Sequence, residues 1–87
     1  MMIKITNKNQ IKMLQILREK NPILLSELNS KLGGFYQLRL IVTELIALDL
    51  INKNENNKIN LCKNVSIKNY DKLGNLEVEI NEWKYNK

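Results

Sequence analysis

Several residue types that carry chemistry are scarce in this chain. It has no histidine, one cysteine (Cys62) and one proline (Pro22). Without histidine or a second thiol it lacks the side chains from which zinc sites and thiol–imidazole nucleophiles are usually built. One cysteine cannot form a disulfide within the chain, so we expect a protein of the reducing cytoplasm. We therefore expect no enzyme activity, no metal site and no cofactor.

Long apolar runs and aromatic side chains are also scarce. No apolar run approaches the roughly 18 residues that span a bilayer, so no membrane partner is expected. The opening segment "MMIKITNKNQ" is interrupted by lysine and asparagine and does not read as a secretory signal. Aromatic residues make up 6% of the chain, which gives little surface for stacking single-stranded bases and disfavours RNA as the partner.

The composition that remains is that of a small basic globular domain. Its 87 residues are 44% hydrophobic and 26% charged, which predicts a single domain over residues 1–87. The net charge of +5 favours polyanions such as nucleic acid. Residues 1–68 hold 11 basic and 5 acidic side chains, whereas residues 69–87 hold 3 and 4. Any polyanion contact is therefore expected in the first three-quarters of the chain.

Helical periodicity begins soon after the first residues. Ile11, Leu14 and Leu17 recur at helical spacing and predict a helix over about residues 8–20. Asn7, followed by glutamine three residues later, predicts a capping box at its start. Pro22 predicts its end, because proline disfavours the helical conformation in the residue before it.

Two more helices are predicted in the next thirty or so residues. The segment "ILLSELNSKLGG" reads as a second helix that ends at Gly33 and Gly34, since glycine readily takes the left-handed conformation at a helix end. Its apolar face comprises Leu25, Leu28 and Leu32. A third helix is predicted over about 36–48, with an inward stripe of Leu38, Val42, Leu45 and Leu48.

After the third helix the apolar period changes from helical to alternating. "LINKNENNKINLCK" predicts a β-hairpin with an asparagine-rich turn. "VSIKNY", "DKLGN" and "LEVEINEW" predict a second hairpin that points Glu77 and Glu79 outward, and "MIKIT" predicts a short strand at the start. The expected fold class is α+β, with a three-helix core over 8–63 and a strand extension over 64–87.

The order of these elements resembles the winged helix-turn-helix family, which includes MarR-like and ArsR-like transcription regulators. The resemblance lies in "LLSELNSKLG" and "LRLIVTELIALDLINK", within residues 8–63. The third helix ends in "LIALDLI", with Asp49 where the family usually has glycine. The resemblance implies a DNA-binding transcription regulator whose third helix enters the major groove while the hairpin, the wing, contacts the backbone or minor groove.

The resemblance also implies contact residues. Groove-facing positions would be Gly34, Phe35, Tyr36, Arg39, Leu40 and Thr43, and wing positions would be Lys53, Asn54, Asn56, Asn57 and Lys58. Arginine can bind guanine through two hydrogen bonds, and the neighbouring Gln37 can pair with adenine. Lysines that could neutralise phosphates are Lys31, Lys53, Lys58 and Lys63. The predicted DNA-binding set is Lys31, Tyr36, Gln37, Arg39, Thr43, Lys53, Asn56 and Lys58.

A second hypothesis assigns the third helix to protein binding. Leu40, Ile41 and Ile46 would form an exposed apolar patch that docks a partner, as in an adaptor of a replication or transcription complex. The tail hairpin could instead cover this patch. Burial of Leu40 and Ile41 under the tail would favour DNA binding. Their exposure, with the wing lysines pointing elsewhere, would favour the adaptor.

The segments outside the core predict how copies could assemble. Many winged-helix regulators dimerise so that two recognition helices reach successive major grooves. The strand edges at 3–5 and 76–80 could pair within one chain or between two chains. We expect a homodimer formed by the N-terminal strand and the C-terminal hairpin, with double-stranded DNA as the other partner.

Overall fold

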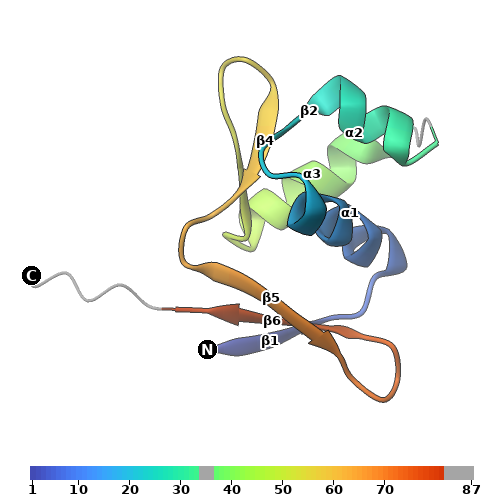
Figure 1. Ribbon diagram of the computed structural model, residues 1–87, viewed down its shortest axis with the longest axis vertical. Helices are drawn as coiled ribbons and strands as arrows, with labels where there is room; N and C mark the ends of the chain where they lie inside the picture. Colours follow the sequence, from blue (N-terminus) through green and yellow to red (C-terminus); the bar gives the residue numbers. More distant parts are fainter. Residues whose placement is uncertain (34–36, 82–87) are drawn as a thin grey trace, which may run out of the picture.

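The computed structural model describes residues 1–33 and 37–81. These residues form three helices and two three-stranded antiparallel sheets, which confirms the predicted α+β class (Figure 1). The elements in chain order are β1 (Met2–Ile5), α1 (Lys8–Glu19), β2 (Ile23–Leu24), α2 (Leu25–Lys31), α3 (Leu38–Ala47), β3 (Ile51–Lys53), β4 (Lys58–Leu61), β5 (Val65–Tyr70) and β6 (Leu76–Ile80).

Helix α1 begins where the capping signal predicted. The Asn7 side chain accepts hydrogen bonds from the backbone N–H groups of Asn9 and Gln10, at 2.9 and 3.1 Å. The second half of the predicted capping box, a hydrogen bond from the Gln10 side chain back to the Asn7 backbone, is wrong. The Gln10 side chain instead donates to Glu44 Oε1 on α3 at 2.9 Å, so it joins two helices rather than closing its own helix start.

The prediction for the second helix is wrong at its beginning. Ile23 and Leu24 form strand β2, which pairs with Ile59 and Lys58 of β4. Ile23 is 1% exposed in this strand. Its β-branched side chain favours a paired strand over a helix start. Helix α2 then starts at Leu25 and ends at Lys31. Gly33 follows with φ +76°, as its predicted role requires, while Gly34 lies outside the described residues.

Helix α3 buries a different stripe from the predicted one. Leu38, Val42 and Leu45 are buried as expected, but Leu48 is 45% exposed and Ile41 is 4% exposed. Leu48 follows the last helical residue as its C-cap, beyond the turns that contact the core. Ile41 completes the i, i+3, i+4, i+7 face that a core-facing helix presents.

The two sheets have the same connectivity, because in each an earlier strand pairs with the second strand of a later hairpin. Sheet I has the order β2-β4-β3 and contains the predicted hairpin at 51–61. In the tip of this hairpin, Asn54 Oδ1 accepts from the backbone N–H groups of Asn56 and Lys58, at 2.9 and 3.0 Å. Sheet II has the order β1-β6-β5 and contains the second predicted hairpin, with β1 paired to β6 within the same chain.

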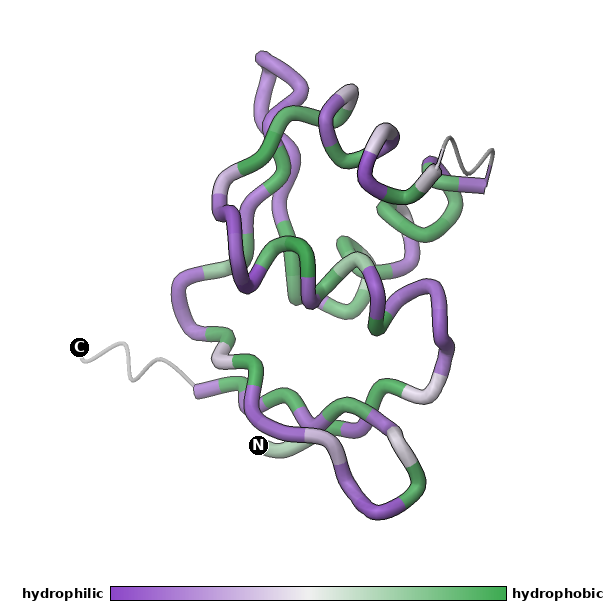
Figure 2. Tube along the Cα trace, turned by 45° about the vertical axis from the view of Figure 1, so that its right-hand side comes forward, coloured by the Kyte–Doolittle hydropathy of each residue, from purple (hydrophilic) through white to green (hydrophobic). Residues whose placement is uncertain are grey.

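Both sheets and all the described helices contribute to one hydrophobic core. Leu14 of α1, Leu28 of α2 and Leu45 of α3 are fully buried, together with Ile59 of sheet I and Val78 of sheet II. Green and purple alternate along sheet II in Figure 2, because one side of its strands faces the core and the other faces solvent. No helix in the described residues is long and apolar enough to cross a membrane.

Candidate nucleic-acid interface

A groove separates α3 from the β3–β4 hairpin. Its volume is about 370 Å³, and its lining comprises Leu25, Arg39, Val42, Thr43, Ile46, Lys53 and Asn57. Three residues of the predicted DNA-binding set, Arg39, Thr43 and Lys53, therefore line one groove. Arg39 and Thr43 come from α3 and Lys53 comes from β3. In the sequence, only the family resemblance predicted that these two elements lie side by side.

A second groove adjoins the first at the start of α2 and α3. Its volume is about 510 Å³, and its lining comprises Leu24, Leu25, Ser26, Asn29, Leu38, Arg39, Asn56 and Asn57. Leu25, Arg39 and Asn57 line both grooves. The predicted residue Asn56 thus lies in the neighbouring groove, with Arg39 between the two.

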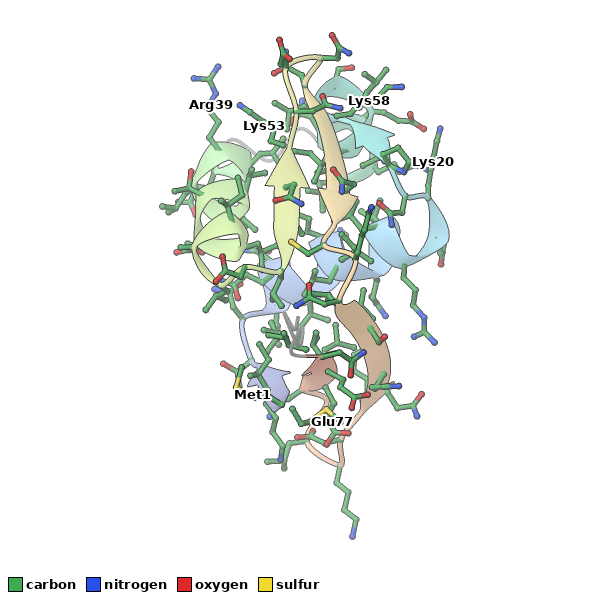
Figure 3. The ribbon with its side chains drawn as sticks, turned by 90° about the vertical axis from the view of Figure 1, so that its left-hand side faces the viewer. Met1, Lys20, Arg39, Lys53, Lys58 and Glu77 are labelled. Atoms are coloured by element: carbon green, nitrogen blue, oxygen red, sulfur yellow. The ribbon has the colours of Figure 1, made fainter. Side chains whose placement is uncertain are left out.

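The basic side chains of this region are exposed and gather at one end of the molecule. Figure 3 shows Arg39, Lys53 and Lys58 at the end of the long axis opposite to Met1 and Glu77. Among the described residues, the ion pairs shorter than 4.0 Å use other lysines, namely Lys4, Lys20 and Lys68. The positive charge near α3 and the hairpin is therefore not neutralised by such a pair in the described structure.

Two polar side chains of α3 are engaged within the protein. Thr43 Oγ1 donates to the carbonyl oxygen of Arg39 at 2.8 Å, so its hydroxyl hydrogen is used and its oxygen is left to accept a hydrogen bond. Glu44 Oε1 accepts a hydrogen bond from the Gln10 side chain of α1. The Glu44 carboxylate is half-buried beside α1 and does not line either groove.

Other predicted residues that the structure describes do not line these two grooves, namely Lys31, Gln37, Lys58 and Lys63. Lys31 lies in another groove of about 610 Å³, between α1 and α2, with Lys12, Gln15, Ile16, Glu19 and Lys20. Gln37 is exposed at the N-cap of α3, and Lys63 is exposed after β4. Tyr36, like Gly34 and Phe35, lies outside the described residues.

The predicted apolar patch on α3 is wrong in one of its three members. Leu40 and Ile46 are 55% and 38% exposed, whereas Ile41 is buried in the core. Ile46 also lines the first groove, where it lies with Thr43 and Lys53. Of the two exposed members, Ile46 therefore belongs to a groove wall, whereas Leu40 lines neither groove.

Sequence reasoning missed the start of α2 as part of the interface. Leu24 and Leu25 line the grooves because strand β2 brings this segment against the hairpin, where the Leu25 N–H donates to the Asn57 carbonyl at 2.8 Å. Asn57 has φ +60°, a conformation that asparagine adopts more readily than most residues. The clustered asparagines of "NENN" were the available signal for this tight tip.

Other candidate chemistry is limited in the described residues. They contain no group of three or more histidine, cysteine, aspartate and glutamate side chains placed to hold a metal ion. Cys62 is half-buried after β4. Burial and then the charge of Asp49 raise the pKa of its thiol, partly offset by a hydrogen bond with the Asn52 side chain.

In comparison with known proteins, no family model, curated protein or solved structure gives a significant match to this chain.

Proposed function

We propose that this chain is a winged-helix protein that binds double-stranded DNA through α3 and the β3–β4 hairpin, and that it acts in transcription regulation. The topology supports the proposal. A helix, a short strand, two helices and a hairpin follow one another, and the short strand β2 pairs with β4 of the hairpin. The element order agrees with the resemblance, and the β3–β4 hairpin, the proposed wing, lies beside α3 across the shared groove.

The junction between α3 and the wing supplies further support. Asp49 stands where the family usually has glycine, and its φ of +61° is the left-handed conformation for which glycine is favoured. The N–H of Asp49 donates to the Ile46 carbonyl, and the N–H of Leu50 donates to the Leu45 carbonyl. The substitution therefore keeps the backbone turn that redirects the chain from helix to strand.

The shared groove is the observation that carries the proposal. Arg39 from α3 and Lys53 from the wing line one groove, and Lys58 lies at the same end of the molecule. A duplex lying there would meet guanidinium and ammonium groups from both elements, which bind phosphate oxygens with little dependence on sequence. Arg39 could in addition bind guanine through two hydrogen bonds.

Protein docking is a second candidate, supported by the exposed Leu40 on the outer side of α3. The adaptor hypothesis also required wing lysines that point away from α3. Leu40 is exposed, but Ile41 is buried in the core and Lys53 lies in the groove beside α3, so neither condition is fully met. DNA binding is therefore the better supported function.

The test is fluorescence anisotropy with a random-sequence duplex over a series of salt concentrations. We expect binding that weakens with a log–log slope of roughly −3 to −6, which corresponds to several phosphate contacts. Lys58→Glu should weaken binding and flatten the slope. Lys72→Glu makes the same change of charge at an exposed turn of sheet II, far from the wing, and should leave binding nearly unchanged.

Two outcomes would contradict the proposal. Wild-type protein that does not bind at low salt would mean that the basic end is only solvated, and Leu40 would become the starting point of a search for a protein partner. Equal weakening by Lys58→Glu and Lys72→Glu would mean that net charge, and not the wing, determines binding.

A further inference from the structure

The two edge strands of sheet II are protected to different degrees. On β5, a register shift between Ile67 and Tyr70 marks a bulge, and Arg18 Nη1 of α1 donates to the Lys68 carbonyl at 3.2 Å. Bulges and covering side chains are the usual means by which proteins prevent an edge strand from pairing with another chain. The outer edge of β5 is therefore obstructed.

Among the described residues, the outer edge of β1 has neither a bulge nor a covering side chain bonded to its backbone. Met1 and Ile80 exchange two backbone hydrogen bonds, at 2.8 and 2.7 Å. Because bonded and non-bonded pairs alternate along an antiparallel ladder, Ile3 also bonds toward β6, whereas the N–H and C=O groups of Met2 and Lys4 point away from it. Within residues 1–33 and 37–81, no backbone group pairs with that outer side.

The side chains at this edge are mostly apolar and are incompletely buried. Met1 and Met2 are 65% and 52% exposed, and Ile3 is only partly buried although it lies on the core-facing side of the sheet. Lysine on an edge strand commonly repels other strands. Here Lys4 Nζ lies 3.3 Å from Asp71 Oδ2, so its charge is matched within its own chain.

We propose that β1 pairs antiparallel with β1 of a second copy of this chain, with Ile3 facing its equivalent across a two-fold axis. In this register Met2 of each copy exchanges backbone hydrogen bonds with Lys4 of the other, using the groups that point outward. The two lysines lie opposite methionines and not opposite each other, so like charges are not brought together. The two Ile3 side chains cover each other on the core side.

The symmetry of such a pair has a consequence for DNA binding, and this consequence rests on the proposed function. The two-fold axis of an antiparallel strand pair is perpendicular to the sheet. It therefore keeps the core of both copies on the same side of one continuous sheet. Arg39 and Lys58 of both copies would point away from that sheet in the same direction, toward one two-fold symmetric duplex (Figure 3).

The first test is the mass in solution without DNA, measured by size-exclusion chromatography with light scattering. We expect wild-type protein and Lys4→Ala to have twice the monomer mass of 10.2 kDa. Lys4→Pro should be monomeric at the same concentration, because proline removes an outward N–H while leaving the bonds of β1 to β6. A monomeric wild type, or a dimeric Lys4→Pro, overturns the proposal.

The second test does not depend on how well proline is tolerated. In a Cys62→Ser background, Ile3→Cys should form a disulfide-linked dimer under mild oxidation, because facing residues of a non-bonded pair lie about 4.5 Å apart at Cα. Met2→Cys should not, since Met2 faces Lys4 of the other copy. Equal cross-linking of the two variants, or none with Ile3→Cys, contradicts the register. Both tests omit DNA, so their failure is distinct from a failure of DNA binding.

Discussion

Sheets I and II are built from the same alternating pattern but present different chemistry to solvent. The hairpin of sheet I carries Lys53, which lines the groove beside α3, and Lys58, which lies at the same end of the molecule. The outer side of sheet II carries Glu77 and Glu79, with Glu79 Oε1 3.2 Å from Lys68 Nζ. The buried residues of both sheets belong to one core. The polar residues that alternate with them along each strand face solvent, and these determine what each end of the molecule can bind.

The largest expected effect tests whether the two sheets are one folding unit. Ile59→Ala in sheet I should lower the free energy of unfolding by about 2–5 kcal/mol, because it removes buried methyl groups and leaves a cavity. Val78→Ala in sheet II removes fewer carbons and should cost less, at about 0.8 kcal/mol per buried methylene plus the cavity cost. Both residues are 0% exposed. Thermal unfolding followed by circular dichroism should show one shifted transition in each variant, and separate transitions would contradict a shared core.

The next prediction tests whether the end formed by α3 and sheet I reads sequence. On a preferred site selected from random duplexes, Arg39→Ala should weaken binding by about 1–3 kcal/mol and relax the preference at one base pair. Arg39→Lys should keep the charge but lose paired hydrogen bonds to guanine, so it should restore phosphate affinity more than specificity. Selection experiments on the three proteins measure both. Uniform weakening on every sequence would limit Arg39 to phosphate contact.

The sequence predicted those parts of the fold that depend on neighbouring residues. The two hairpins follow from local alternation and turn residues, and the Asn7 cap follows from spacing alone. Strand β2 could not be predicted in this way, because Ile23 is extended only through its pairing with the distant Ile59. Leu48 was predicted to be buried and Ile41 to be exposed, and the structure shows the reverse. The segment "LRLIVTELIALDL" has apolar residues on several sides of the helix, and packing against the core decides which of them are buried.

The candidate site was predicted less completely than the fold. Arg39, Thr43 and Lys53 line one groove, and only the resemblance, through its relation between helix and wing, suggested that they lie together. Lys31 was grouped with them on charge alone, but the packing of α2 on α1 directs it to another groove. The Gln10 side chain was assigned to a capping box, but it bonds to Glu44 of another helix, and no local pattern reveals such a contact.

Each sheet also relies on an aspartate at a turn, and Asp49 gives the larger of the two expected effects. Asp49→Gly should raise the free energy of unfolding by up to about 1 kcal/mol, because glycine adopts φ +61° without steric cost. Asp49→Ala should lower the free energy of unfolding by about 1 kcal/mol, because alanine adopts the left-handed conformation less readily than aspartate. Asp49 is exposed, so packing changes little in either variant. Chemical denaturation measures both, and the same sign of change in both would contradict the argument.

The smallest effect concerns Asp71 in the turn of sheet II. Hydrogen bonds from the N–H of Asn75, then that of Leu73, together with Lys4 hold the pKa of this carboxyl below its ordinary value of 3.8. A lowered pKa in the folded state stabilises the fold above the ordinary value, and this contribution is lost as pH falls through the folded pKa. Denaturation of wild type and Asp71→Asn should therefore differ most near neutral pH and converge in acid. A difference that does not depend on pH would contradict this assignment.

The hydrogen bond between Leu25 and Asn57 fixes the wing at its tip as well as at its base. The hairpin leaves α3 at Leu50 and is attached to the start of α2 at its far end, so the distance between α3 and the wing is set before any ligand arrives. Under the proposed function, the DNA has to adapt to the protein. Sequences that reach the required groove width at low deformation cost would be preferred, even at base pairs that no side chain touches.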